Sequence, residues 1–295
     1  MNSIFLTGWS GFVGTSFLSY FKSDIIRTSL RGKESEIEDS RIVIHLAGKA
    51  HDLKKTSKPD EYYQVNTELT KKVFDAFLAS EANVFITLSS VKALADEVQG
   101  ELTEELIANP ITHYGKSKLF AEQYILSKEI PKGKRVYILR PCMIHGPGNK
   151  GNLNMLFKIV SKNIPWPLGS FENKRSICSI DNLLFIFREL IERENIPSGI
   201  YNVADDESFS TNELISLIAQ SQNKKTKLWK IPKGFIGLIS TLGDKLHLPL
   251  NTDRLQKLTS SYVVSNAKIK MAIGKPWPVS SREGLLRTFE SFKSQ

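Results

Sequence analysis

The chain has 295 residues, of which 41% are hydrophobic and 24% charged, so it can form one large α/β unit or two lobes with a full-sized core. Its formal net charge is +9, but the basic residues are dispersed and no nucleic-acid-binding motif is present. We therefore expect an anionic small substrate to explain part of the charge, with no nucleic-acid partner.

Neither the cysteines nor the N-terminus indicates a secreted protein. Cys142 and Cys178 lack CxxC spacing, so we expect reduced core residues and neither a disulfide framework nor a metal site. The N-terminus has no charged segment followed by an apolar stretch and a cleavage site. We therefore expect a cytoplasmic protein.

The first predicted element is a buried apolar strand over residues 4–7 that runs into glycines spaced three apart. Glycine makes a tight turn and lets the backbone approach a pyrophosphate, while the N-terminus of the following helix offers free N–H groups. This order of strand, turn and helix predicts a dinucleotide site. Its expected cofactor contacts are Gly8, Ser10, Gly11, Phe12, Val13 and Gly14.

A second strand is predicted over residues 25–30, and its end faces the adenosine ribose of a bound dinucleotide. A carboxylate there would bind the 2′-hydroxyl of NAD, whereas the sequence has Arg27 and Arg31 and no nearby acid before Glu34. The arginines favour a 2′-phosphate and thus NADP, with NAD as the other possible cofactor. The alternative is that both arginines are ordinary surface residues.

A third strand is predicted over residues 42–47, because a continuous apolar run is typical of a parallel strand covered on both faces. The turn that follows brings Leu46, Ala47 and Gly48 beside the cofactor. His45 lies inside the run without a second metal ligand at a helical or hairpin spacing. We interpret it as a core histidine with satisfied hydrogen bonds.

An amphipathic helix over residues 69–78 leads to a fourth strand over residues 84–88, which ends at Ser89 and Ser90. Ligands of an open parallel sheet lie at the carboxyl ends of its strands, so these hydroxyls can meet a substrate. By themselves, two serines after a strand are also common as helix caps or turn residues.

Tyr114 and Lys118 share one face of a helix that begins after Asn109-Pro110. A free tyrosine has a pKa of about 10, and an ammonium about 4 Å away favours the phenolate by up to ~4 kcal/mol at an effective dielectric near 20. Lysine can also donate to the nicotinamide ribose. Together with the glycine turn and Ser90, this spacing predicts an acid–base site.

These features resemble the extended short-chain dehydrogenase/reductases, specifically the NAD(P)-dependent nucleotide-sugar epimerase/dehydratase family, nearly from end to end. The motifs that carry the resemblance are Thr7-Gly8-x-x-Gly11-x-x-Gly14, His45-Leu46-Ala47, Val65-Asn66, Ser89-Ser90, Tyr114-x-x-x-Lys118, Arg140-Pro141, Gly146-Pro147-Gly148, Arg175-Ser176, Asp181-Asn182-Leu183, Gly274-Lys275-Pro276-Trp277-Pro278 and Glu283-Gly284-Leu285.

The resemblance implies a role for each of five residues. Tyr114 would be the acid–base catalyst, and Lys118 would tune it and bind the ribose. Ser90 would donate a hydrogen bond to the sugar oxygen. Asn152 and Arg175 match positions that hold the nucleotide diphosphate in relatives, although the loops there vary in length.

The two residues after Ser90 bear on the reaction. In family dehydratases the first is a carboxylic acid that protonates the departing C6 hydroxyl, and the second is a base, glutamate or lysine, that removes the C5 proton. This chain has Val91 and Lys92 at these positions, so it lacks the acid. Valine cannot donate a proton, so elimination would lose general-acid help typically worth about 10²–10⁴-fold. Lys92 either contacts the sugar or is solvated.

We therefore expect a UDP-4-keto-6-deoxy-hexosamine 4-reductase of surface polysaccharide synthesis. The alternatives are a UDP-glucose or UDP-N-acetylglucosamine 4-epimerase and, from another class, a non-catalytic NAD(P)-sensing regulator. His145 and Met143 replace a tyrosine and a substrate-binding asparagine that are common in relatives, which puts the sugar contacts at those positions in doubt.

The expected fold is α/β, a doubly wound parallel sheet over residues 1–150 with residues 176–204 returning to it. A smaller α/β substrate lobe would comprise residues 151–175 and 205–295, with substrate between the lobes and a homodimer as a possible assembly. In this lobe Ser210 to Glu213 predicts a capping box. The apolar segment 234–240 is far shorter than the roughly 20 residues of a membrane span and predicts a buried or interfacial helix.

Overall fold

The computed structural model describes residues 3–22, 25–28, 37, 40–50, 58–149, 151–246 and 251–294. Its main feature is a six-stranded parallel sheet, in the order β2-β1-β3-β4-β6-β9. The strands are β1 (Ile4–Thr7), β2 (Ile25–Thr28), β3 (Ile42–His45), β4 (Val84–Leu88), β6 (Arg135–Pro141) and β9 (Gly199–Val203). Because β2 and β3 lie on opposite sides of β1, the strand order reverses there, and in sheets of this kind ligands bind outside the carboxyl ends of the strands at such a reversal.

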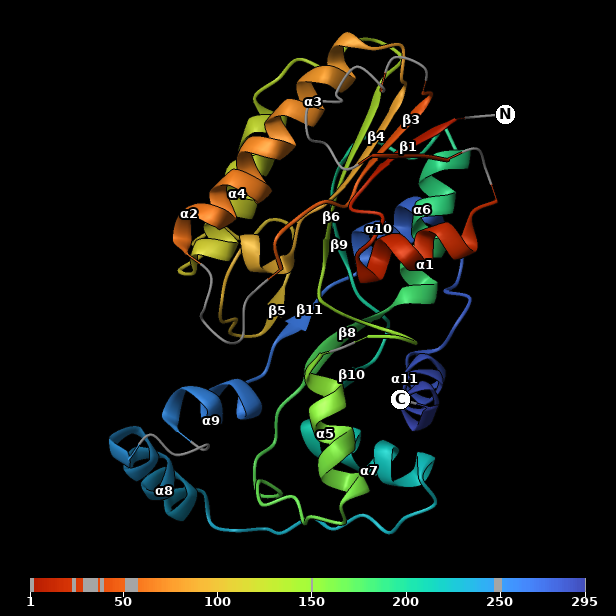
Figure 1. Ribbon diagram of the computed structural model, residues 1–295. Helices are drawn as coiled ribbons and strands as arrows, with labels where there is room; N and C mark the ends of the chain where they lie inside the picture. The colour runs from red at the N-terminus through yellow and green to blue at the C-terminus, as the bar shows by residue number, and fades with distance from the viewer. Residues whose placement is uncertain are drawn as a thin grey trace.

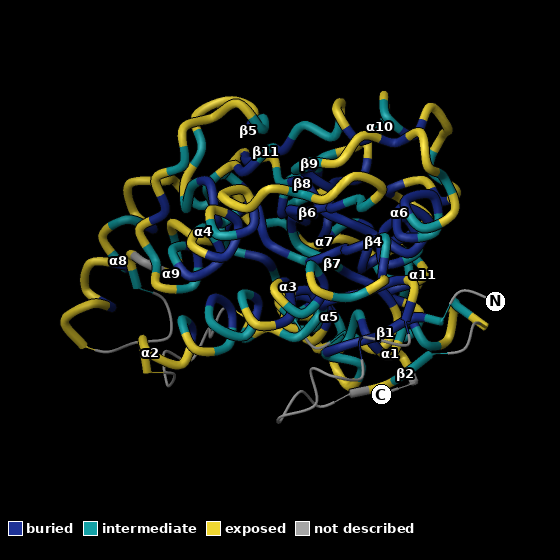
Figure 2. The backbone as a smooth tube through the Cα atoms, turned by 90° about the horizontal axis from the view of Figure 1, so that it is seen from above, coloured by how far each residue is buried: buried dark blue, intermediate teal, exposed yellow. Residues whose placement is uncertain are grey.

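Helices cover both faces of this sheet (Figure 1). One layer contains α2 (Pro59–Tyr62), α3 (Leu69–Ala79) and α4 (His113–Leu126), with a π-helical turn at Tyr63–Glu68 between the first two. The other layer contains α1 (Phe12–Tyr20), α6 (Ile180–Glu192) and α10 (Ala267–Ile273). The predicted α/β doubly wound sheet is confirmed, and its buried strands occupy the middle of the molecule (Figure 2).

A second hydrophobic core lies below the large sheet in Figure 1. Around it are the helices α5 (Asn152–Ser161), α7 (Thr211–Ser221), α8 (Lys233–Leu246), α9 (Thr252–Thr259) and α11 (Ser281–Ser291). A three-stranded sheet joins β7 (Met143–His145), β8 (Arg175–Ser179) and β10 (Ser208–Phe209), and a two-stranded sheet joins β5 (Glu101–Leu102) and β11 (Val263–Val264). Within the described ranges, 3-10 turns occur at Val91–Ala93 and Phe292–Ser294.

Strand pairing shows which segments of the chain belong to the large sheet and which to the smaller one. As expected, α6 and β9 return to the large sheet, but β8 pairs with β7 in the smaller sheet. From the far end of the chain, Ile269 and Ile273 of α10 pack into the core of the large sheet. Pairing between distant segments decides these placements, so the division of the chain by residue number stays a prediction.

Several local expectations are confirmed. The capping box at Ser210 and Glu213 is present and starts α7. Both cysteines are free and buried, and burial raises the pKa of each thiol. The described part of the second strand ends at Thr28, two residues earlier than expected.

The apolar segment 234–240 lies in α8, which is only partly buried. Of its residues, Ile236, Ser240 and Gly243 face the second core, whereas several large apolar side chains point outward. None of the described helices combines the length and the hydrophobicity that crossing a membrane requires.

Candidate active site

The glycine turn has the close contacts that its sequence predicts. Gly8 has φ +67°, and a Cβ atom there would lie 2.4 Å from the backbone nitrogen of Ala47. A Cβ on Gly14 would lie 2.2 Å from the carbonyl oxygen of Gly8. Gly11 donates its N–H to that same oxygen at 3.1 Å and caps α1, and a Cβ there would make only a 3.4 Å contact with it. The first and third glycines are thus required for packing.

The loop after β3 lies directly against this turn. Leu46 donates its N–H to the Thr7 carbonyl at 3.2 Å, and Ala47 donates to the Thr7 hydroxyl at 3.1 Å. A Cβ on Gly48 would lie 3.1 Å from the Lys118 Nζ. The two segments predicted to bind cofactor therefore meet, and the second of them adjoins the predicted ribose-binding lysine.

The remaining predicted cofactor residues differ in position. Ser10 is exposed at the turn, and Phe12 and Val13 are partly buried in the first turn of α1. Arg27 is exposed on the edge strand β2, where its backbone is opposite Leu6, and Arg31 lies outside the described residues. A glycine turn followed by a helix N-terminus fits the pyrophosphate of a dinucleotide.

Ser90 and Tyr114 come together at the carboxyl edge of the sheet. Ser90 is buried after β4, where its hydroxyl caps a 3-10 turn by accepting the Lys92 N–H at 3.2 Å. Tyr114 comes from the first turn of α4 and forms a side-chain hydrogen bond with Ser90. The Tyr62 ring packs edge-on against the Tyr114 ring with centroids 6.2 Å apart.

The pKa of Tyr114 departs from the expectation that Lys118 would lower it. Burial raises the pKa of this phenol, and the hydrogen bond from Ser90 only opposes that shift. Lys118 instead donates its Nζ to the Leu88 carbonyl at 2.8 Å. Burial lowers the pKa of Lys118 to about 8, against the opposing effect of Glu122. In the protein alone, Tyr114 is therefore a protonated phenol at neutral pH.

Sequence reasoning missed the charged pair beneath Lys118. Glu122, one turn further along α4, accepts the Arg140 Nε–H at 2.9 Å and also bonds to the Ser89 hydroxyl. Both members of the ion pair are buried, so their mutual hydrogen bonds compensate for lost hydration. The spacing of Lys118 and Glu122 was the available signal, but Arg140 is distant in sequence.

Asn66 is a second positioning residue, which appeared in a motif without an assigned role. It is buried in the π-helical turn, where its Oδ1 accepts the Lys49 N–H at 2.7 Å and its Nδ2 donates to the Ser117 hydroxyl at 3.0 Å. It therefore ties the loop after Gly48 to the helix that carries Tyr114 and Lys118.

His45 is a core residue, as expected. Its Nδ1 lies 2.8 Å from the Thr7 hydroxyl and its Nε2 lies 3.0 Å from the Thr70 hydroxyl. Burial, followed by the nearby charge of Lys118, lowers the pKa of His45 to about 3. The ring is neutral at physiological pH.

Lys92 and Arg175 lie close together near Ser90, and these two cations form a cationic wall of the site. Lys92 donates its Nζ to the Asp96 carbonyl at 2.6 Å and sits over the Tyr262 ring, 4.3 Å from its centroid, so it is not simply solvated. Burial lowers the pKa of Lys92; Asp96 opposes this shift and Arg175 adds to it. The Arg175 guanidinium donates to the Lys257 carbonyl of α9.

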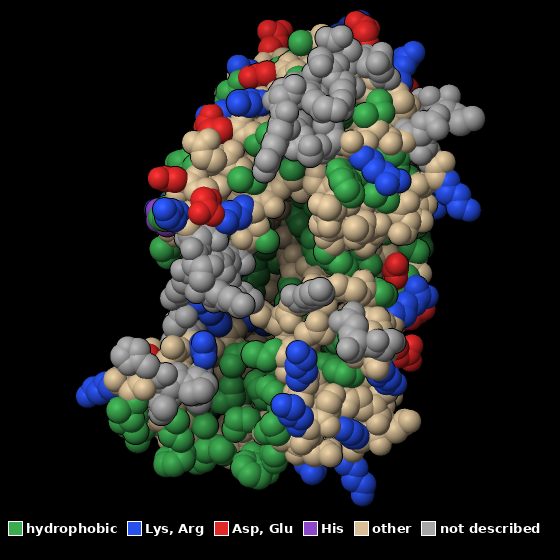
Figure 3. All heavy atoms as spheres, viewed as in Figure 1, with side chains coloured by type: hydrophobic (Ala, Val, Ile, Leu, Met, Phe, Trp, Pro, Cys, Tyr) green, Lys and Arg blue, Asp and Glu red, His purple; other side chains and the backbone are tan. Residues whose placement is uncertain are grey.

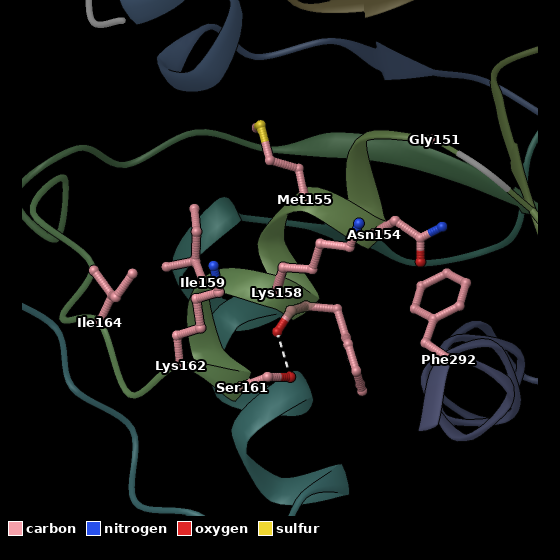
Figure 4. A pocket seen from close by; sticks show the side chains of 10 residues that line it. Gly151, Asn154, Met155, Lys158, Ile159, Ser161, Lys162, Ile164 and Phe292 are labelled. Atoms are coloured by element: carbon pink, nitrogen blue, oxygen red, sulfur yellow. Dashed lines mark hydrogen bonds between the residues drawn. The ribbon is translucent and has the colours of Figure 1, made fainter. Parts of the chain in front are cut away.

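Asn152 is exposed at the first position of α5, and among the described residues no hydrogen bond joins it to Ser90, Lys92 or Arg175. Nearby, a pocket of about 760 Å³ opens along the side of α5 (Figure 4). Its lining is Gly151, Asn154, Met155, Phe157, Lys158, Ile159, Ser161, Lys162, Ile164 and Phe292. This pocket contains neither Tyr114 nor the cofactor turn.

The two substitutions relative to common family residues have structural roles here. His145 is buried, with its Nδ1 2.9 Å from the Thr288 hydroxyl and its Nε2 3.6 Å from an Asp205 carboxylate oxygen. Met143 packs against the second core. Both side chains stabilise the joint between β7 and the C-terminal helix.

The doubly wound sheet, the glycine turn and the Ser90, Tyr114 and Lys118 group together define an extended short-chain dehydrogenase/reductase. Residues 22–204 match the NAD dependent epimerase/dehydratase family, and the chain belongs to this family.

Two relatives cover most of the chain. It is 30% identical to a UDP-glucose 4-epimerase of Vibrio cholerae over 98% of this chain and 95% of that protein. It is 27% identical to an N-acetyl-alpha-D-glucosaminyl-diphospho-ditrans,octacis-undecaprenol 4-epimerase of Escherichia coli O157:H7, over 91% of this chain and 85% of that one. The fold is similar to that of RMD from Pseudomonas aeruginosa complexed with NADPH, with a TM-score of 0.75 at 21% identity over 100% of both chains.

Proposed function

We propose that this protein reduces the 4-keto group of a UDP-linked 4-keto-6-deoxy-hexosamine. The observation that carries the proposal is the hydrogen-bonded pair of Ser90 and Tyr114, which lies at the sheet edge where Lys118 meets the cofactor loop. Because burial raises the pKa of Tyr114, its resting form is the phenol, which is the form that a reductase needs.

Each residue has a definite task in this reaction. The turn from Gly8 to Gly14 and the loop at Gly48 would hold a nicotinamide dinucleotide, which supplies the hydride that C4 accepts. Tyr114 donates its proton to the oxygen that was the ketone, and Ser90 donates a hydrogen bond to the same oxygen. Lys118 would hold a positive charge beside the ribose of the bound cofactor.

Dehydration fits the site poorly. Val91 is buried at 4% exposure, and its carbonyl accepts the Tyr262 hydroxyl at 3.2 Å. No acidic side chain occupies the position from which a dehydratase protonates its leaving hydroxyl. Reduction and epimerisation both need only an acid–base group at O4, which Tyr114 provides.

The cationic wall supports a diphosphate substrate. Lys92 and Arg175 are close enough that the charge of Arg175 lowers the pKa of Lys92, and a phosphate between them would relieve this repulsion. We propose that the diphosphate of a UDP-sugar binds here, with Asn152 at a more distant contact. The proposed reaction would take place in the cytoplasm.

The proposed cofactor is NADPH, on the basis of Arg27 and Arg31 and of the NADPH complex of the Pseudomonas aeruginosa protein. Titration of both reduced cofactors should give tighter binding of NADPH, and Arg31→Ala should remove the difference. Equal binding of NADH that is unaffected by this substitution would contradict the preference. Lys33→Ala, at a neighbouring basic residue, is the matched control.

A UDP-sugar 4-epimerase is the second candidate, because the Vibrio cholerae and Escherichia coli relatives both have 4-epimerase names. An epimerase regenerates its cofactor in each turnover, so it needs no added reductant. A non-catalytic cofactor sensor would turn over no sugar at all.

One assay separates these functions. We expect a UDP-4-keto-6-deoxy-hexosamine to oxidise NADPH in equal amount, and Tyr114→Phe to abolish the reaction while the protein still binds NADPH. Interconversion of glucose-type and galactose-type UDP-sugars without added cofactor would establish the epimerase instead. Cofactor binding without turnover of any of these sugars would support the sensor.

A further inference from the structure

The helix α8 has an apolar stripe on its outer side that no described part of the chain covers. The exposed side chains follow one another at intervals of three, four and four residues, which places them on one face. They are Phe235, Leu238, Leu242 and Leu246, with exposed fractions of 57%, 72%, 53% and 59%. The opposite side of the helix packs on the second core through Ile236.

A basic rim, which consists of Lys233, Lys245 and Arg254, adjoins this stripe. Residues 224–257 contain eight Lys or Arg and two Asp, which amounts to six of the nine net positive charges of the chain. Lys233 and Lys245 are exposed near the two ends of α8, Arg254 is exposed on α9, and Trp229 is 57% exposed just before the helix. In Figure 3 the hydrophobic side chains gather over α8 at the lower end of the molecule, with Lys and Arg side chains beside them.

Hydrogen bonds connect α8 through α9 to the candidate site. Asp244 of α8 accepts the N–H and the hydroxyl of Thr252 at the start of α9, at 3.1 and 2.8 Å. The Lys257 carbonyl near the end of α9 accepts the Arg175 guanidinium. The outer face of α8 therefore lies one helix away from the cationic wall.

We propose that the stripe of Phe235, Leu238, Leu242 and Leu246 with its basic rim docks this protein on an anionic lipid bilayer. A short helix with large apolar side chains on its outer face and cations around it lies in the plane of a membrane interface. The apolar stripe enters the acyl boundary while lysine and arginine reach the anionic headgroups. Trp229 suits the same depth, because an indole is apolar with one polar end.

Charge argues against a second copy of this chain as the occupant. A two-fold interface places the same patch of each subunit against the other, so the basic rim would face its own like charges. An anionic bilayer has the opposite charge and can contact the whole stripe at once. This inference concerns the surface alone and does not depend on the proposed reaction.

Flotation with lipid vesicles tests the proposal on the full chain. We expect the wild type to float with phosphatidylethanolamine vesicles that contain phosphatidylglycerol, less with phosphatidylcholine alone, and less at high salt. Leu238→Glu combined with Leu242→Glu should lower partitioning at least about tenfold, because it removes two membrane-inserting side chains. The matched control is Ile107→Glu with Met271→Glu, which changes two residues that are more exposed but lie elsewhere.

Three results would overturn the proposal. The wild type could fail to float, or the α8 variant could float as well as the wild type. Light scattering could also show that the wild type is an oligomer that the α8 variant disrupts, with no vesicle binding, which would make the stripe an interface between copies. NADPH oxidation with a water-soluble sugar nucleotide is measured separately and should be equal in both proteins, so failure of the reaction does not resemble failure of docking.

Discussion

At the scale of single residues, burial controls the acid–base chemistry of the site. Lys118 is 8% exposed and its Nζ has one carbonyl partner, so the cost of holding its charge lowers its pKa to about 8. Burial also favours the neutral form of Tyr114, which raises the pKa of this phenol. An acid and a cation thus coexist at neutral pH, without the phenolate that their spacing alone suggests.

Loss of the Lys118 charge should limit activity in alkali. We expect kcat/KM to fall as pH rises through about 8, because Lys118 loses its proton there while Tyr114 keeps its own. Lys118→Arg should move this fall to higher pH, since a guanidinium stays charged. Lys116→Arg, on the same helix, should leave the profile unchanged, and a profile that ignores Lys118→Arg would exclude this lysine as the titrating group.

His45 should make the fold sensitive to acid. Its folded pKa of about 3 lies below its usual 6.5, so between these values the unfolded chain binds a proton that the folded chain does not. Stability is therefore lost as pH falls below 6.5, by about 2 kcal/mol at pH 5.

Urea denaturation at pH 7 and pH 5 measures this effect. The difference between the two pH values should shrink by about 2 kcal/mol in His45→Asn and stay unchanged in His113→Asn, because His113 is exposed. An equal pH dependence in all three proteins would mean that His45 does not titrate as described.

At the scale of elements, the glycines of the turn between β1 and α1 differ in whether packing requires them. Gly8 and Gly14 are needed because other backbone atoms occupy the space of their Cβ atoms. A Cβ atom on Gly11 would make only a 3.4 Å contact with the Gly8 carbonyl oxygen, so packing does not require this glycine and we propose that it leaves room for the cofactor. The glycine pattern therefore mixes folding and binding requirements.

Two single substitutions separate these requirements. Gly14→Ala should destabilise the fold by about 1–3 kcal/mol, because its methyl would lie 2.2 Å from the Gly8 carbonyl oxygen. Gly11→Ala should change stability by no more than about 0.5 kcal/mol yet weaken NADPH binding. Urea denaturation and fluorescence titration give the two quantities, and similar losses of stability in both variants would contradict this division.

At the scale of the whole molecule, the proposed substrate side of the site combines segments from both cores. Lys92 follows β4 of the large sheet, Arg175 begins β8 of the small sheet, and Tyr262 precedes β11 and contacts both. The face shown in Figure 3 is hollowed near its middle. A ligand that bridges these residues would stabilise the joint as well as occupy the site.

Removal of the Arg175 side chain should weaken UDP binding by about 1.5–3 kcal/mol, the usual value of a charged hydrogen bond. Isothermal titration of UDP into Arg175→Ala and into Lys174→Ala, an exposed neighbour, measures this loss. Circular dichroism checks that the contact of Arg175 with Lys257 is not required for folding. Unchanged affinity in Arg175→Ala would remove this residue from the site.

The amino-acid sequence by itself determined the features that depend on neighbouring residues. The strand at Val84–Leu88, the capping box at Ser210 and the placement of Tyr114 and Lys118 on one helix all follow from short periodic patterns. The family motifs placed the glycine turn in the same way. Local spacing fixes such features because the backbone of a helix, strand or turn repeats over a few residues.

Only the tertiary structure decided what distant segments do to one another. The partner of Glu122 is 18 residues away and that of His145 is 143 residues away, and no local pattern connects either pair. The pKa of Tyr114 depends on how many groups surround its hydroxyl after folding. The four large apolar side chains of α8 face outward, whereas its buried residues are Ile236, Ser240 and Gly243, so hydrophobicity alone does not indicate which face is buried. Burial is a property of the whole packed chain, which is why spacing alone could not predict it.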